Sequence, residues 1–236
     1  MLTLGRLELG RIPRIAVPLS DTEVYEHGQI AKGLAHIFEL RIDGFTRRTP
    51  DDVAAVCHQA RAHDVALIAT VRAKDEGGRV ALDDSTRLGL FERVAPLVDG
   101  LDVEFGAAIR DRVVALGRRH RKLVLVSHHD FERTPADSAL TGIVDQAAAA
   151  NADIVKLAVA THAMADVDRL LGVLRSRPAV PLIIIALGPH GTMSRVFFPL
   201  LRPLITYGYL HTPNAPGQLS LEELHAEMRR YCPDYD

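Results

Sequence analysis

Three observations predict that the chain folds as one α/β domain, a (β/α)8 or TIM barrel spanning residues 1–236. Its 236 residues match the length at which such barrels form single domains. Eight short aliphatic stretches alternate with eight helix-like stretches, and no linker or low-complexity segment separates them. A doubly wound open sheet is the alternative, but no GxGxxG motif follows the first strand and no Walker lysine motif is present.

The first four strand–helix pairs follow from apolar runs that end at turn residues. Expected strands lie at 14–20, 36–43, 66–72 and 100–105. A helix follows each of them, at about 21–33, 51–63 and 84–97, and then up to about 119. Asp21 and Thr22 are suited to begin the first of these helices, because short polar side chains cap helix N-termini.

The last four pairs follow the same pattern. Expected strands lie at 122–129, 152–160, 181–188 and 204–210. Expected helices run to about 150 and then span about 164–176, 192–201 and 220–231. A Pro- and Gly-containing loop at about 211–219 precedes the last helix.

The sixth strand, ADIVKLAVA, carries a single charge at Lys156. Burial of a lone ammonium lowers a lysine pKa, and a partly neutral lysine attacks carbonyl groups. A lysine at a frayed strand end that reaches water is the alternative interpretation. Aliphatic residues flank Lys156 on both sides, so we favour a functional lysine.

Charged residues also occupy the inward-facing phase of neighbouring strands, because side chains alternate along a strand. They lie in the carboxyl-terminal halves, the end at which barrels of this kind carry their active sites. The set comprises Glu39, Arg41, Asp43, Arg72, Asp102, Glu104 and His129. Their convergence on Lys156 predicts an active site, since unpaired buried charges are costly.

These residue types suit imine chemistry on a ketone. His129 titrates near neutrality and is the natural base for a proton beside an imine carbon. Glu76, in the loop after the third strand, could orient His129 and favour its cationic form. Arg195, at the start of the helix after the seventh strand, could pair with a substrate carboxylate.

Seven segments, in order and spacing, resemble those of type I 3-dehydroquinate dehydratase, a Schiff-base enzyme. They are ELRID (39–43), TVRAKDEGG (70–78), DVEF (102–105), SHHDFERTP (127–135), ADIVKLAVA (152–160), LGPHGTMSR (187–195) and APGQ (215–218). The resemblance implies that Lys156 forms an imine with the C3 ketone of 3-dehydroquinate. It implies that His129, partnered by Glu76, removes a C2 proton and protonates the leaving C1 hydroxyl to give 3-dehydroshikimate, a step in aromatic amino-acid biosynthesis.

The same resemblance implies a set of substrate-binding residues and a lid at 211–219. The set comprises Glu39, Arg41, Arg72, Arg195, Asn214 and Gln218. Four positions depart from the family: Asn214 replaces a frequent serine, Leu187 a methionine, Tyr207 a phenylalanine, and His128 an asparagine or small polar residue. The resemblance implies no cofactor and no metal, and it makes a homodimer plausible.

Composition and charge exclude other classes of protein. The chain has 28 Lys and Arg against 30 Asp and Glu, a net charge of −2, so no nucleic-acid partner is indicated. The longest apolar run, near 182–187, is strand-sized, and the N-terminal segment has no signal-peptide core, so no membrane partner is expected. Cys57 and Cys232 are far apart and are interpreted as free thiols of a cytoplasmic protein.

Three alternatives for the function remain at the level of sequence. A class I Schiff-base aldolase or transaldolase acting on a sugar phosphate could use the glycine-containing loop at 188–191. A metal-dependent hydrolase would need both His128 and His129, which lie on opposite faces of one strand. A catalytically inactive barrel that acts as a binding module is the third.

Overall fold

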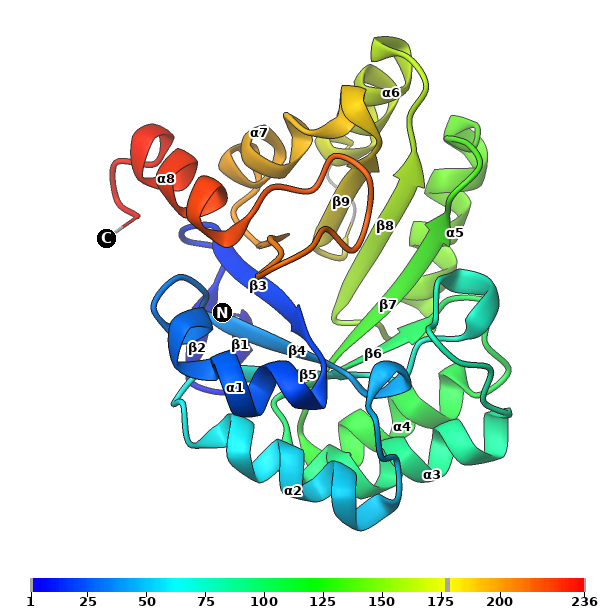
Figure 1. Ribbon diagram of the computed structural model, residues 1–236. Helices are drawn as coiled ribbons and strands as arrows, with labels where there is room; N and C mark the ends of the chain where they lie inside the picture. The colour runs from blue at the N-terminus through cyan, green and yellow to red at the C-terminus, as the bar shows by residue number, and fades with distance from the viewer. Residues whose placement is uncertain (1, 177–178, 236) are drawn as a thin grey trace.

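The computed structural model describes residues 2–176 and 179–235 and confirms the predicted barrel. Within them, eight parallel strands pair in the order β10-β3-β4-β5-β6-β7-β8-β9, and the helices surround this nearly closed sheet (Figure 1). The strands are β3 (Arg14–Leu19), β4 (Ile37–Arg41), β5 (Ala66–Thr70), β6 (Gly100–Glu104), β7 (Leu123–Asp130), β8 (Ile154–Ala160), β9 (Leu182–Leu187) and β10 (Ile205–Tyr207).

A helix follows each barrel strand, as the sequence predicts. These are α1 (Asp21–Lys32), α2 (Pro50–Arg61), α3 (Asp84–Val94), α4 (Arg110–His120), α5 (Asp137–Ala149), α6 (Met164–Arg175), α7 (Ser194–Leu201) and α8 (Leu221–Tyr231). The N-cap of helix α1 is Ser20, which forms a capping box with Glu23, and not Asp21 or Thr22 as predicted. Helix α3 ends at Val94, earlier than predicted, because Pro96 lacks the N–H that an α-helix needs and a 3₁₀ turn follows.

The N-terminal segment forms a hairpin that sequence analysis did not predict. Strands β1 (Leu2–Leu4) and β2 (Leu7–Leu9) pair antiparallel to each other. The side chains of Leu4 and Leu9 are buried among the aliphatic residues that fill the barrel interior. The hairpin therefore closes the amino-terminal end of the barrel, which leaves the carboxyl-terminal end for a site.

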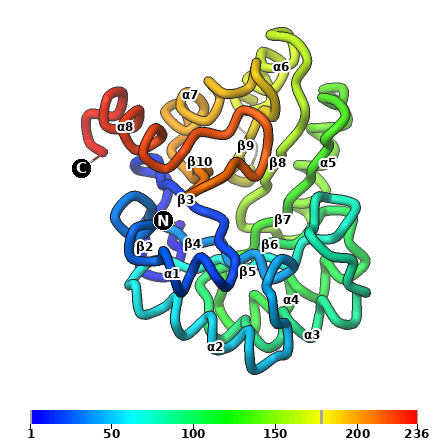
Figure 2. The backbone as a smooth tube through the Cα atoms, viewed as in Figure 1, coloured from blue at the N-terminus to red at the C-terminus, as the bar shows by residue number. Residues whose placement is uncertain are grey.

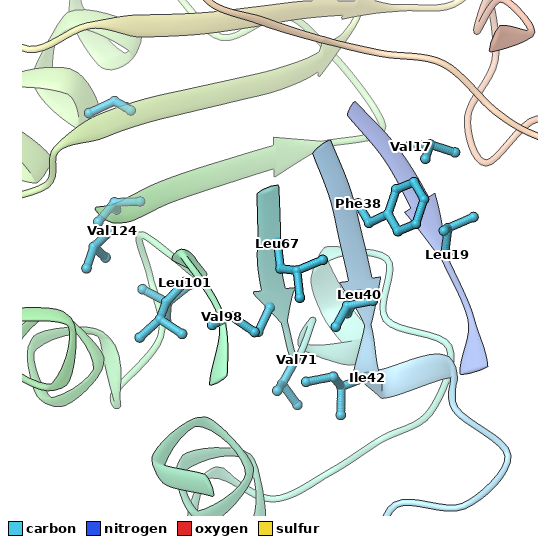
Figure 3. Packing of buried hydrophobic residues seen from close by; sticks show 14 of the residues in the cluster. Val17, Leu19, Phe38, Leu40, Ile42, Leu67, Val71, Val98, Leu101 and Val124 are labelled. Atoms are coloured by element: carbon cyan, nitrogen blue, oxygen red, sulfur yellow. The ribbon is translucent and has the colours of Figure 1, made fainter. Parts of the chain in front are cut away.

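Two hydrophobic clusters lie on the two sides of the sheet. The larger one packs the outer face against the helices and includes Phe38, Leu40 and Ile42, as predicted from the strand phase (Figure 3). The smaller one fills the barrel and includes Ile68, Leu125 and Ile154, among others. These interior residues form a floor beneath the polar side chains of the same strands.

The strand register aligns the polar residues at one end of the barrel. Thr70 of β5 is paired with Asp102 of β6, and Ser127 of β7 is paired with Lys156 of β8. His129 lies two residues beyond Ser127 and therefore on the same face of β7. The loop between β10 and α8 passes across this end and contacts the turn after β9, where Gly188 N donates to Pro216 O (Figure 2).

Candidate active site

One pocket at this end of the barrel brings together the nine residues that the sequence analysis assigned to catalysis or substrate binding. Its cavity volume is about 100 Å³, and Tyr207, Phe131 and Leu187 also line it. The nine are Glu39, Arg41, Arg72, Glu76, His129, Lys156, Arg195, Asn214 and Gln218. They come from strands β4, β7 and β8, helix α7 and the loops that follow β5 and β10.

Lys156 is buried, and acidic side chains of β4 and β6 lie beside its ammonium. Its Nζ lies 3.0 Å from Asp102 Oδ2 and 3.8 Å from Glu39 Oε2. The Nζ atom also lies 4.4 Å from the ring centroid of Tyr207, a cation–π distance. The amine is therefore held in one place by two carboxylates and an aromatic face.

Arg72 joins the carboxylates around Lys156 into one network. Its guanidinium donates to Asp102 (2.9 Å), Glu104 (3.2 Å) and Ser127 (2.7 Å), and the Ser127 hydroxyl donates to Asp102. Burial works against the ionised form of Asp102, yet Arg72 and then Lys156 hold the pKa of this carboxyl well below its usual range. Arg72 thus fixes the lysine's counter-ion, a role that the resemblance did not indicate.

Arg87 supports this network and was missed by sequence analysis. It lies on α3, is buried, donates to Val71 O at 3.0 Å, and forms an ion pair with Glu104. Its spacing from Phe91 and Val94 on one face of α3 is the only signal, and an arginine on an apolar helix face is ordinarily taken as solvated.

His129 is oriented by Glu76, as expected from the sequence. Glu76 Oε2 lies 2.9 Å from both Nδ1 and the backbone N of His129. The expected cationic form is wrong, because burial, Arg72 and Lys156 lower the pKa of His129 well below 6.5. Burial also raises the pKa of Glu76 to about 7. Above that pH the Glu76 carboxylate accepts a hydrogen bond from the Nδ1–H group of His129, so Nε2 keeps a lone pair and can act as a base.

Arg41 is fixed at the mouth of the pocket by a fully buried carboxylate. Its Nε and Nη2 lie 3.1 and 3.0 Å from the two oxygens of Asp43, and Nη2 also donates to Gly77 O. Asp43 in turn accepts the backbone N–H groups of Arg72 and Arg79. This bidentate pair sets the direction of the Arg41 side chain before any ligand arrives.

Arg195 is a buried cation in the pocket. Among the described residues, its side chain donates only to backbone carbonyl oxygens. Its Nε donates to Gly217 O at 2.9 Å and its Nη1 to Tyr207 O at 3.4 Å, while Nη2 has no partner. Burial lowers the pKa of Arg195 to about 10. A buried guanidinium with an unused N–H group favours an anionic ligand, because pairing would remove its desolvation cost.

The loop at 211–219 is folded over the pocket. Asn214 N donates to the side chain of Gln218, and Arg79 Nη2 lies 3.5 Å from Asn214 Oδ1.

His128 does not line the pocket, so it does not share a site with His129. No group of three or more His, Cys, Asp or Glu residues within residues 2–176 and 179–235 could hold a metal ion. No helix in the described ranges is long and apolar enough to cross a membrane.

Comparisons with known proteins agree on one family. A model of the type I 3-dehydroquinase family matches residues 15–229. The 3-dehydroquinate dehydratase of Hydrogenobaculum sp. is 33% identical over 212 residues, which cover 89% of this chain and 95% of the relative. That of Pyrococcus abyssi is 36% identical, with coverages of 90% and 95%.

Solved structures give the same result. The 3-dehydroquinate dehydratase of Aquifex aeolicus superposes with a TM-score of 0.85 at 31% identity, covering 93% of this chain and 99% of that one. The type I enzyme of Clostridium difficile, solved with covalent modified comenic acid, gives a TM-score of 0.89 at 25% identity, with coverages of 97% and 96%.

Proposed function

The chain belongs to the type I 3-dehydroquinase family, and we propose that its reaction proceeds through an imine on Lys156 with His129 as acid and base. The enzyme is a lyase that dehydrates 3-dehydroquinate to 3-dehydroshikimate. The observation that carries the residue assignment is the shared pocket of Lys156 and His129, with a carboxylate against each nitrogen base.

Imine formation begins when the Lys156 ammonium loses a proton. Asp102 is a poor acceptor because its pKa is held low, so the Glu39 carboxylate at 3.8 Å takes this role. The neutral amine then attacks the C3 ketone, and the carbinolamine loses water to give a protonated imine. The protonated imine draws electrons from C2, which makes the C2 proton removable.

Elimination then uses one residue twice. Nε2 of neutral His129 takes the C2 proton, and the bonding pair forms the enamine. His129 returns that proton to the C1 hydroxyl, which leaves as water while the C1–C2 double bond forms. Hydrolysis of the product imine consumes one water, which offsets the water released on imine formation. The net change is loss of one water from the substrate.

Binding residues follow from charge and exposure. We assign the substrate carboxylate to Arg195, whose Nη2 has no protein partner in the described pocket. Arg41, Asn214 and Gln218, which are at least partly exposed, and Glu39, which is buried beside Lys156, are assigned to hydroxyl groups, since together they offer donors and acceptors. The closed loop excludes water that would hydrolyse the imine early.

The test is reduction of the intermediate with sodium borohydride in the presence of 3-dehydroquinate, followed by intact mass and peptide mapping. A stable adduct on Lys156 is expected, and Lys156→Ala should give neither adduct nor turnover. Lys32→Ala, on the exposed face of α1, is the matched control and should behave like the unaltered enzyme. An adduct with a sugar phosphate but none with 3-dehydroquinate would instead support the aldolase alternative.

His129 is tested in the same trap. His129→Ala should lose turnover, because no other base is assigned to the C2 proton, yet it should still form the reducible imine. Full activity of this variant would refute the assignment.

We further propose that the enzyme works in the cytoplasm as a homodimer. Cys57 and Cys232 are unpaired thiols, which suits a reducing compartment. Phe197 and Leu201 on α7 and Met193 at its N-cap are exposed large apolar side chains at four-residue spacing. Light scattering after size exclusion would test the dimer, and a monomeric mass across the assay concentration range would refute it.

A further inference from the structure

The hydroxyl of Tyr207 is a buried group in the pocket to which no step above assigns a role. Two side-chain donors of the described pocket residues are buried without a hydrogen-bond partner, Arg195 Nη2 and the Tyr207 hydroxyl. A buried hydroxyl that makes no hydrogen bond costs free energy in the folded protein. Such a cost is retained where a ligand supplies the missing partner, and the Arg195 group illustrates the same principle.

The ring of Tyr207 already has a contact that explains an aromatic residue here. Tyr207 lies on β10, is 4% exposed, and belongs to the aliphatic cluster that fills the barrel. Its ring centroid is 4.4 Å from Lys156 Nζ. A phenylalanine would provide this cation–π contact and the same packing, so neither accounts for the oxygen atom.

The oxygen is a permanent hydrogen-bond donor. Burial, followed by the nearby carboxylates of Glu39 and Asp102, raises the pKa of Tyr207 well above its ordinary value of 10. The group therefore remains O–H at every pH at which the enzyme would be assayed. It needs an acceptor that is close to Lys156 and arrives with the ligand.

We propose that the Tyr207 hydroxyl donates a hydrogen bond to the C4 hydroxyl oxygen of 3-dehydroquinate. This inference rests on the proposed function, because it requires the imine between Lys156 and C3. The carbons beside C3 are C2, a methylene, and C4, which carries a hydroxyl, so the C4 oxygen is the hydroxyl oxygen nearest the lysine nitrogen. Tyr207 is thus a specificity residue that selects substrates oxygenated beside the reacting ketone.

Tyr207→Phe removes only the oxygen and keeps the ring over Lys156. With 3-dehydroquinate, KM should rise roughly 3- to 10-fold, the effect of one lost neutral hydrogen bond, while kcat stays within about twofold. With an analogue of 3-dehydroquinate that lacks the C4 hydroxyl, the variant and the unaltered enzyme should have the same KM. Tyr209→Phe, two residues along the chain and outside the pocket lining, is the matched control and should leave both values unchanged.

Thermal unfolding without substrate separates this role from a structural one. Because the hydroxyl has no protein partner, Tyr207→Phe should unfold at the same or a higher temperature than the unaltered enzyme. A lower Tm would mean that the oxygen stabilises the fold and would overturn the proposal.

Two further outcomes would overturn it: an unchanged KM for 3-dehydroquinate, or an equal rise in KM with the analogue. Borohydride trapping keeps this result distinct from failure of the proposed function. An adduct on Lys156 in both proteins with equal KM values refutes the Tyr207 assignment alone. Absence of an adduct in the unaltered enzyme refutes the proposed mechanism.

Discussion

Asp102 Oδ2 lies 3.0 Å from Lys156 Nζ, and both side chains are withdrawn from water. The same carboxylate accepts from Arg72 and from the Ser127 hydroxyl, so one anion is held by two cations and a hydroxyl. A buried charge is tolerated only when such partners replace its hydration. Lys156, the proposed nucleophile, is therefore also part of the electrostatic framework of the barrel.

Replacing this carboxylate should affect both stability and chemistry. Asp102→Asn leaves two buried cations with less compensation, so we expect the free energy of unfolding to fall by about 3 kcal/mol. Urea denaturation measures this loss, and the rate of adduct formation in the borohydride trap should fall as well. Asp111→Asn, a change at an exposed ion pair on α4, is the control and should cost less than about 1 kcal/mol. Equal stability of the two variants would contradict the framework role of Asp102.

The orientation of His129 gives a second prediction. In Glu76→Gln the amide can present an NH2 group to Nδ1, which would move the proton to Nε2 and remove the lone pair from the pocket. We expect kcat to fall at least about tenfold while KM changes little. Steady-state kinetics check this, with Glu92→Gln on the exposed face of α3 as control. Unchanged kcat in Glu76→Gln would mean that the Glu76 carboxylate does not set the tautomer of His129.

Much of this site could be predicted because its signals are local. An isolated lysine in an aliphatic strand and charged residues in one strand phase were sufficient to identify Lys156 and its neighbours. The register of β6, β7 and β8 then confirmed that these phases share one face. The prediction of which strand residues face the barrel interior and which face the helices was correct, because alternation along a strand is fixed by backbone geometry.

The features that were not predicted depend on long-range contacts. Arg87 reaches Glu104 from α3, where its spacing from Phe91 and Val94 is too weak a signal to predict a buried cation, and the ion pair exists only after α3 packs on the sheet. The N-terminal hairpin is two three-residue strands, too short for a periodic signal. The charge state expected for His129 was wrong because it followed from Glu76 alone, whereas burial and two neighbouring cations determine the outcome.

His36 predicts how stability depends on pH. Its Nδ1 accepts the backbone N–H of Ile15 at 3.1 Å, and burial, then Arg14 and His225, lower its pKa from 6.5 to about 4. Between these values the unfolded chain binds a proton at His36 that the native chain does not. The stability that this neutral histidine provides is therefore lost as pH falls from 6.5 towards 4, by roughly 3 kcal/mol.

A substitution isolates this contribution from those of other groups. In His36→Asn the side-chain oxygen can still accept from Ile15 N, but it does not titrate in this range. The difference in unfolding free energy between the unaltered enzyme and His36→Asn should shrink or reverse as pH falls from 7 to 4.5. His58→Asn, at an exposed position of α2, should show a constant difference. A constant difference for His36→Asn as well would exclude the histidine as a source of acid sensitivity.

Gly217 is the position at which the loop over the pocket can be tested with one methyl group. Its φ of +72° is a conformation that residues with a Cβ adopt at a cost, and the added Cβ would collide with the carbonyl oxygen of Gly188. Gly217 O also accepts from Arg195 Nε. Gly217→Ala should therefore displace the loop and release one restraint on Arg195, so we expect KM to rise at least about tenfold.

The barrel itself should be unaffected, because the loop contributes little to either hydrophobic cluster. Thermal unfolding of Gly217→Ala should stay close to that of the unaltered enzyme, and amide hydrogen exchange should rise within 211–219 and not in the barrel strands. Gly89→Ala is the matched control, since nothing lies within 4 Å of the added Cβ and Gly89 is in the middle of α3. That variant should keep its KM and gain up to about 1 kcal/mol of stability from helix propensity. Unchanged KM in Gly217→Ala, with exchange in the loop increased, would show that substrate binding does not require the closed loop.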